Sequence, residues 1–165
     1  MNLEETQYFT DSDIKLLQNL GGKELSGVSY FIWENVAKKN ETFSFLLAAE
    51  LCFSDGARLM ISSGDSEELP HIALNQLNLE EEKKMVKESF GGALQIKTTD
   101  ATNSDLWKSL TGKQIAGIEL AAEEGTKKPF ASHFIIRIDD TPILIRTGDQ
   151  GDGIHIEYYL PEEDE

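Results

Sequence analysis

The chain has 165 residues, of which 39% are hydrophobic and 27% charged, a composition typical of a globular protein with one ordinary domain or two very small ones. Thirty acidic and fifteen basic residues leave a formal net charge of −15, which argues against nucleic-acid backbones and anionic membrane surfaces as partners. A single cysteine, no apolar run long enough to span a membrane and no signal-peptide pattern at the N-terminus lead us to expect a cytoplasmic protein.

The first predicted element is a short helix that begins next to Thr10. Thr10 has the side chain of an N-cap residue, and Asp13 would lie in the first turn, where acidic side chains are favourable. An antiparallel meander should follow, because short runs of alternating apolar residues are separated by turn residues. Its strands are predicted over residues 28–32, 43–53, 58–62 and, more weakly, 69–74. In the second strand we expect the odd-numbered apolar residues from Phe45 to Phe53 on one face.

A glycine interrupts the apolar alternation at the start of the first strand. Leu25 lies three positions before Val28, which is out of phase with the two-residue period of a strand. A β-bulge at Gly27 would return both apolar side chains to one face. The same pattern recurs at Ile115 and Gly117, so we expect a second bulge there.

A second helix is predicted near the middle of the chain. Asn78 and Glu81 have the spacing of a capping box, and Gly91 is suited to the C-terminal end of the helix. A short strand over residues 93–97 should follow, because Leu94 and Ile96 alternate with polar residues.

The second half of the chain repeats blocks of the first half. Residues 20–28 align with residues 110–118 at a spacing of 90, with Leu, Gly, Lys and a second Gly identical. Later blocks align at spacings of 85 and 84, namely 45–53 with 130–138, 61–65 with 145–149, and His71-Ile72 with His155-Ile156. The second half should therefore begin with a helix capped by Thr102, with Asp105 in its first turn. Its strands are predicted over residues 118–122, 134–138, 143–147 and 153–160.

These repeats favour an α+β fold in which internally duplicated helix-plus-antiparallel-meander units form one pseudo-twofold body. Each unit is too small to bury a generous core alone, so we expect the two units to share one domain. The predicted organisation is an N-terminal extension (1–10), a first repeat (11–77), a linking helix and short strand (78–101), a second repeat (102–160) and an acidic tail (161–165).

Two matched loops each combine carboxylates with a histidine. Asp149, Asp152 and His155 are candidate ligands for a divalent metal, and a hydrolytic reaction is the activity that such a site would support. Asp65 and His71 would be a degenerate twin of this site. The alternative interpretation is a solvated acidic turn with a surface histidine, because the spacing matches no established metal motif.

The common catalytic signatures, such as nucleophile elbows, HExxH, CxxC and Walker loops, do not occur in the sequence. We therefore expect neither catalytic residues nor a cofactor. Cys52 lies mid-strand among apolar residues and is expected to be a buried, inert thiol. His133 has no counterpart in the first half, and we assign it no role.

Several aromatic residues are candidates for a surface that binds another protein. Tyr30, Phe31 and Trp33 share one strand, so either both faces of that strand are buried or an apolar patch faces a partner. The negative charge of the chain would favour a basic partner. We select as candidate partner-binding residues Trp33, Glu34, Tyr158 and Tyr159.

The leading hypothesis is a non-enzymatic protein-binding module, of an immunity-like or regulatory kind. In size and acidity the chain resembles many small bacterial proteins, among them immunity proteins that neutralise toxins, and no diagnostic motif carries this resemblance. The metal site is the second hypothesis. Homo-oligomerisation through an exposed strand is the third.

Overall fold

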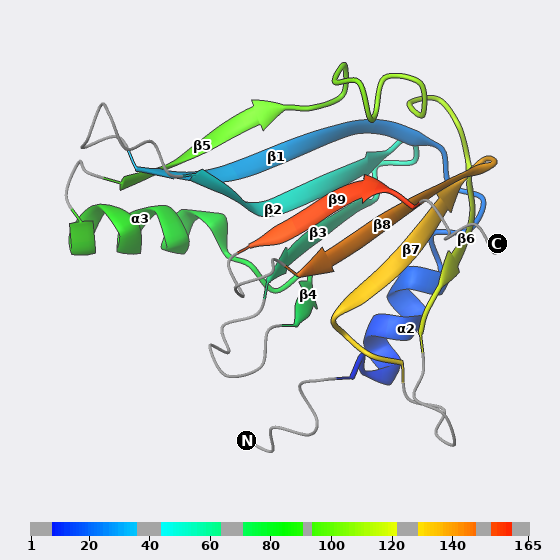
Figure 1. Cartoon of the computed structure of the whole chain (residues 1–165), viewed down its shortest axis with the longest axis horizontal. Helices are drawn as coiled ribbons and strands as arrows, with labels where there is room; N and C mark the ends of the chain where they lie inside the picture. Colours follow the sequence, from blue (N-terminus) through cyan, green and yellow to red (C-terminus); the bar gives the residue numbers. More distant parts are fainter. Residues whose placement is uncertain are drawn as a thin grey trace, which may run out of the picture.

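Two antiparallel sheets and two helices make up the part of the chain that the computed structural model describes (Figure 1). That part consists of residues 8–35, 44–63, 71–90, 94–121, 129–147 and 153–159. The predicted α+β class is confirmed. In chain order the elements are α2 (Asp11–Gln18), β1 (Leu25–Asn35), β2 (Ser44–Phe53), β3 (Arg58–Ser63), β4 (Ile72–Leu74), α3 (Leu79–Phe90), β5 (Leu94–Asp100), β6 (Ile115–Glu119), β7 (His133–Ile138), β8 (Thr141–Thr147) and β9 (Ile154–Tyr158).

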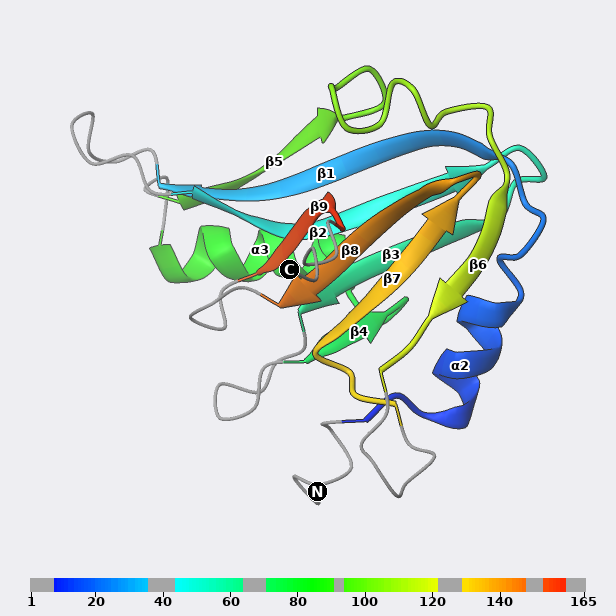
Figure 2. The same ribbon diagram turned by 45° about the vertical axis from the view of Figure 1, so that its right-hand side comes forward.

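Each sheet contains a four-stranded meander. The first sheet has the order β4-β3-β2-β1-β5, so that β5 is added beside β1, and the second has the order β6-β7-β8-β9. All pairings within both sheets are antiparallel. The four-stranded sheet lies across one face of the five-stranded sheet, and α2 lies beside β6 (Figures 1 and 2).

Both predicted glycine positions interrupt the strand register. The pairing of β1 with β2 shifts between Leu25 and Gly27, and the pairing of β6 with β7 shifts between Ile115 and Gly117. Leu25 and Val28 are both buried as a result. The predicted bulges are confirmed, and they place the apolar residues before and after each glycine on the core side of the strand.

The predicted alternation along β2 is wrong in its first part. Phe31 pairs with Ala48 and Ile32 pairs with Leu46, so that Leu47 is an extra residue in β2. Beyond this irregularity the side chains change faces. Ala49, Leu51 and Phe53 lie in the core between the sheets, whereas Phe45 and Leu47 lie on the outer face of the five-stranded sheet.

One contiguous cluster of buried side chains includes residues of both sheets and of α2. A smaller cluster on the outer face of the five-stranded sheet is centred on Phe31, Leu47 and Ala48, and Leu79 of α3 packs against it. Trp33 belongs to this outer cluster, while Tyr30 packs against the core on the other face. The aromatic residues of β1 therefore lie on two faces that are both covered by other parts of the chain.

Both helices begin as the capping patterns predict. The hydroxyl of Thr10 accepts the N–H of Asp13 at 3.1 Å, and the carboxylate of Asp13 accepts the N–H of Thr10 at 3.1 Å. The side-chain oxygen of Asn78 accepts the N–H of Glu81 at 3.2 Å. Within the described ranges neither helix has the length and apolar character required to cross a membrane.

The helix predicted to open the second repeat is not formed. Residues 102–112 are a run of turns, held by bonds such as that from the Trp107 N–H to the Ser104 carbonyl oxygen at 3.1 Å. The hydroxyl of Thr102 accepts the N–H of Val28 in β1 at 3.0 Å and donates to the Val28 carbonyl oxygen at 3.4 Å, so it bonds β1 instead of acting as an N-cap. The prediction is wrong because a tertiary contact uses the group that the local pattern assigns to a helix.

The turns that precede β1 and β6 bind each other reciprocally. Gly22 and Gly112, at matching places in the two turns, have φ angles of +83° and +92°, the left-handed region that favours glycine. Four backbone hydrogen bonds join the turns, from Gly22 to Ile115 (2.8 Å), from Gly112 to Leu25 (2.7 Å), from Leu25 to Lys113 (2.9 Å) and from Ile115 to Lys23 (2.8 Å), naming the N–H donor first.

Candidate functional site

The predicted metal ligands are only partly within the described residues. Asp65, Asp149 and Asp152 lie outside them. His155 is exposed on β9, in register with Arg146 of β8, whereas His71 is half-buried and precedes β4 in the other sheet. Among the residues that the structure describes, no group of three or more His, Cys, Asp or Glu side chains is placed to hold a metal ion. The metal site stays a prediction.

Cys52 is half-buried, whereas a buried thiol was expected. Desolvation raises the pKa of the Cys52 thiol, and the nearby carboxylate of Glu50 raises it further. Both effects favour the neutral thiol over the reactive thiolate.

The four candidate partner-binding residues lie in two places. Trp33 is half-buried in β1 and stacks on Phe45, with 4.9 Å between the ring centroids, while its neighbour Glu34 accepts a hydrogen bond from Gln95 at 3.2 Å. Tyr158 and Tyr159 are 44% and 37% exposed at the end of β9 in the other sheet. The structure does not bring the two pairs together into one surface.

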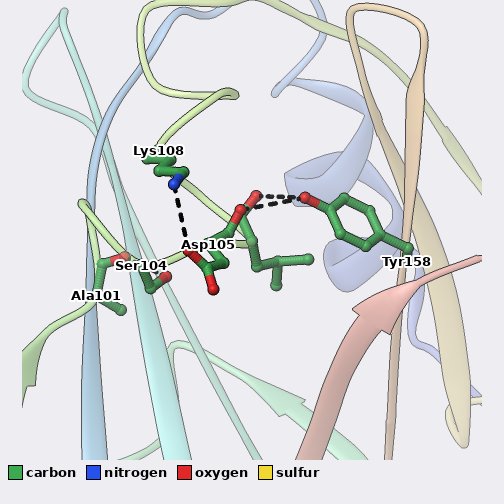
Figure 3. Close-up of polar contacts among 6 residues, drawn as sticks. Ala101, Ser104, Asp105, Lys108 and Tyr158 are labelled. Atoms are coloured by element: carbon green, nitrogen blue, oxygen red, sulfur yellow. Dashed lines mark hydrogen bonds and ion pairs between the residues drawn. The ribbon is translucent and has the colours of Figure 1, made fainter.

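The end of β9 contacts the turns that replace the predicted helix. Figure 3 shows the hydroxyl of Tyr158 within hydrogen-bonding distance of two main-chain oxygens, that of Asp105 at 3.3 Å and that of Leu106 at 3.2 Å. The carboxylate of Asp105 points away from Tyr158 and forms an ion pair with Lys108 at 3.2 Å. Ser104 stabilises the same turns by donating its hydroxyl to the Ala101 carbonyl oxygen at 2.7 Å.

Exposed acidic residues lie in β9 itself and in the two turn segments that contact its end. The N–H of Tyr159 bonds to the Pro142 carbonyl oxygen at 3.0 Å, which places β9 beside the exposed β7–β8 turn. The side chain of Asp105 is fully exposed, and that of Glu157 is about half exposed. We define the tyrosine edge as the surface formed by Asp105, Asp139, Asp140, Glu157, Tyr158 and Tyr159.

A second surface is the outer face of the four-stranded sheet, turned away from the core. Phe134, Ile136 and Ile138 of β7 are buried, so the alternate residues of that strand point to the outer face. The register of β7, β8 and β9 places three outward-pointing residues, one from each strand, side by side in the order His133, Arg146, His155.

A hollow of about 610 Å³ lies on this outer face. Half-buried apolar side chains, including Ile135 and Leu144, line part of it, together with polar side chains such as His133 and Arg146. Sequence reasoning missed this site. The alternation along β7 and β8 could have placed each residue on a face, but only the strand register shows that His133 and Arg146 are neighbours.

Searches for relatives found no matching family model, no matching curated protein and no matching solved structure.

Proposed function

We propose that the chain is a non-enzymatic protein-binding module that engages a basic partner through the tyrosine edge. The observation that carries the proposal is the pair of adjacent exposed tyrosines, Tyr158 and Tyr159, at the end of a strand that contacts two turn segments with exposed acidic residues. Tyrosine is enriched among the residues that dominate protein interfaces, because its ring buries a large area and its hydroxyl can still bond.

The tyrosine edge is held in place before any partner binds. Tyr158 is tied to the turn segment by its hydroxyl, and Tyr159 is tied to β8 by its main chain. A surface that is already ordered loses less conformational entropy on binding. This fixed geometry supports the assignment of the end of β9 as a contact surface.

Charge favours a basic partner. The net charge of −15 would speed the encounter with a positively charged protein. Asp105 and Asp139 form exposed ion pairs with Lys108 and Lys113, and such exposed pairs contribute little to stability. Lysine or arginine side chains of a partner could therefore replace these lysines at small cost.

Trp33 and Glu34 remain a separate prediction, because they lie in the five-stranded sheet. We also keep the expectation that the protein acts in the cytoplasm, which rests on the sequence alone.

Capture of partners from a native lysate at low salt, with matched variants, tests the proposal. Tyr159→Ala and Asp140→Lys each change the tyrosine edge, whereas Glu88→Lys reverses an exposed charge on α3. We expect the wild-type chain and the Glu88→Lys variant to retain the same basic protein, and the two edge variants to lose it. An acidic partner, or equal retention by all variants, would contradict the proposal.

We further propose that the two meanders arose by duplication and pack as one pseudo-twofold body, with repeats at 11–77 and 102–160 joined by residues 78–101. The reciprocal bonds between the turns support this, as does the bulge at a glycine near the start of β1 and again of β6. Matching ion pairs join Lys23 to Asp55 and Lys113 to Asp139. The turns at 102–112 are the main departure, since α2 opens the first repeat.

A further inference from the structure

The outer face of the four-stranded sheet gathers side chains that are scarce in this chain. The sequence contains three histidines and three arginines. Two of each lie on this face, namely His133, His155, Arg137 and Arg146. Among the described residues of this face, Glu119 and Glu157 form ion pairs with Arg137 and Arg146, so these charges balance in a chain with a net charge of −15.

Arg146 lies in the middle of this arrangement and has a defined orientation. Its Nε donates to the Glu157 carboxylate at 3.0 Å, and one terminal nitrogen donates to the Thr147 carbonyl oxygen at 3.4 Å. The side chain is 29% exposed, so these bonds act in a partly desolvated setting. A guanidinium fixed in this way is pre-organised to donate to a planar or tetrahedral oxyanion.

His133 is oriented as well. Its Nδ1 lies 2.9 Å from the hydroxyl of Ser132, an interaction whose donor depends on the ring tautomer. Cross-strand pairing places His133 directly opposite Arg146. Two nitrogen-bearing side chains from adjacent strands therefore flank the polar side of the hollow.

The carboxylate of Glu119 also lines the hollow, where its ion pair with Arg137 at 3.3 Å balances its charge, and apolar side chains complete the lining. Leu120, Ile135 and Leu144 are half-buried and contribute apolar surface to the hollow. Its volume of about 610 Å³ is within the range of small-molecule sites. Because the net charge of −15 opposes the approach of a bare anion, apolar contact must add to the charged contact for useful affinity.

We propose that this hollow binds a small organic oxyanion, a carboxylate or phosphate monoester that carries an apolar group. Arg146 and His133 contact the oxyanion, and Ile135 and Leu144 contact the apolar group. The site does not depend on the proposed protein-binding function, although two residues of the tyrosine edge take part in it: Tyr159 lines the hollow and Glu157 binds Arg146.

NMR titration of the full chain with phenyl phosphate, benzoate and phenol tests this site. We expect saturable amide shifts at His133, Ile135 and Arg146 with at least one of the two oxyanions, and none with neutral phenol. Saturation by phenyl phosphate would identify a phosphate monoester as the ligand class, and saturation by benzoate would identify a carboxylate. Inorganic phosphate should bind more weakly than phenyl phosphate, because it has no apolar group.

Two arginine variants provide the matched comparison. Arg146→Gln should weaken binding about tenfold or more, because a charge-assisted hydrogen bond is lost. Arg58→Gln removes the same charge from the other sheet, where Arg58 does not line the hollow, so affinity should change by less than about twofold. If Arg146→Gln does not give a folded spectrum, Arg146→Lys serves instead and should also weaken binding.

Three results would overturn the proposal. They are the lack of any saturable shift up to about 10 mM of either oxyanion, equal weakening by the two glutamine variants, and equally tight binding of phenol. Failure of the oxyanion titration would leave the lysate test of the tyrosine edge unaffected, because that test measures retention of a protein and its Asp140→Lys variant changes a residue that does not line the hollow.

Discussion

The indole Nε1 of Trp107 donates a hydrogen bond to the hydroxyl of Tyr30, with 2.5 Å between the two atoms. The two residues are 77 positions apart, and Trp107 is fully buried while Tyr30 is half-buried. Burial raises the pKa of Tyr30, and the bond from Trp107 partly offsets this rise. This contact fixes the turn segment 102–112 against β1.

Tyr30→Phe removes the acceptor of this bond and leaves the indole N–H of a buried side chain without it. We expect the free energy of unfolding to fall by about 1–3 kcal/mol, measured by urea denaturation. Tyr158→Phe is the matched control, since the Tyr158 hydroxyl is at the surface, and it should cost less than about 0.5 kcal/mol. Equal losses of unfolding free energy in the two variants would show that the buried hydrogen bond stabilises the fold no more than the surface one.

Gly153, the residue before β9, lies close against β2 of the other sheet. A Cβ atom added there would lie 2.1 Å from the carbonyl oxygen of Leu46 in β2, and the φ angle of Gly153 is +68°. Gly153→Ala should therefore destabilise the protein by about 3 kcal/mol or more. Gly56→Ala controls for the backbone, because Gly56 has φ of +92° and open space around it, and it should cost about 1 kcal/mol. Similar thermal shifts for the two variants would contradict the packing of β9 on β2.

Gly22 and Gly112 should respond alike to substitution. Both have positive φ angles, and neither would bring an added Cβ within 4 Å of another atom. Gly22→Ala and Gly112→Ala should each cost about 1–2 kcal/mol from backbone strain alone. Denaturant titration should give values within about 0.5 kcal/mol of each other. A large asymmetry would argue against equivalent roles for the two turns.

Asp100 links β5 to the turn segment. Hydrogen bonds from Thr102, first from its side chain and then from its N–H at 2.9 Å, lower the pKa of the Asp100 carboxyl. A lowered folded-state pKa means that the ionised carboxylate stabilises the fold above the ordinary value of 3.8 and that this contribution is lost as the pH falls through the folded-state value.

Asp100→Asn should therefore lower the melting temperature at neutral pH, and the difference from wild type should shrink below pH 3.8. Asp140→Asn removes the same charge from an exposed turn and controls for net charge. A difference for Asp100→Asn that grows on acidification would contradict the assignment.

Local patterns in the sequence predict much of this fold. The cap at Thr10 and the bulges at Gly27 and Gly117 follow from the chemistry of single residues and their neighbours. Thr102 resembles Thr10 locally, but its hydroxyl binds Val28, which is 74 residues away. No local pattern shows that contact, so the helix predicted to open the second repeat is wrong.

The irregularity at Leu47 has no glycine to signal it, and for this reason the face of Phe45 is predicted wrongly. The hollow could not be predicted either, because it depends on the register of three strands. Tyr158 and Tyr159 were selected from the sequence as candidate surface residues, and both are exposed in the structure.

Both proposed surfaces depend on two sheets that share one core, and amide hydrogen exchange tests that claim most directly. If the two sheets share one core, the slowest-exchanging amides of β2 and β7, such as those of Ala49 and Phe134, should give the same free energy of opening. Ile136→Val, a substitution in the core side of β7, should lower both values equally, by about 1 kcal/mol. Different limiting values for the two sheets, or a fall confined to the four-stranded sheet, would contradict it.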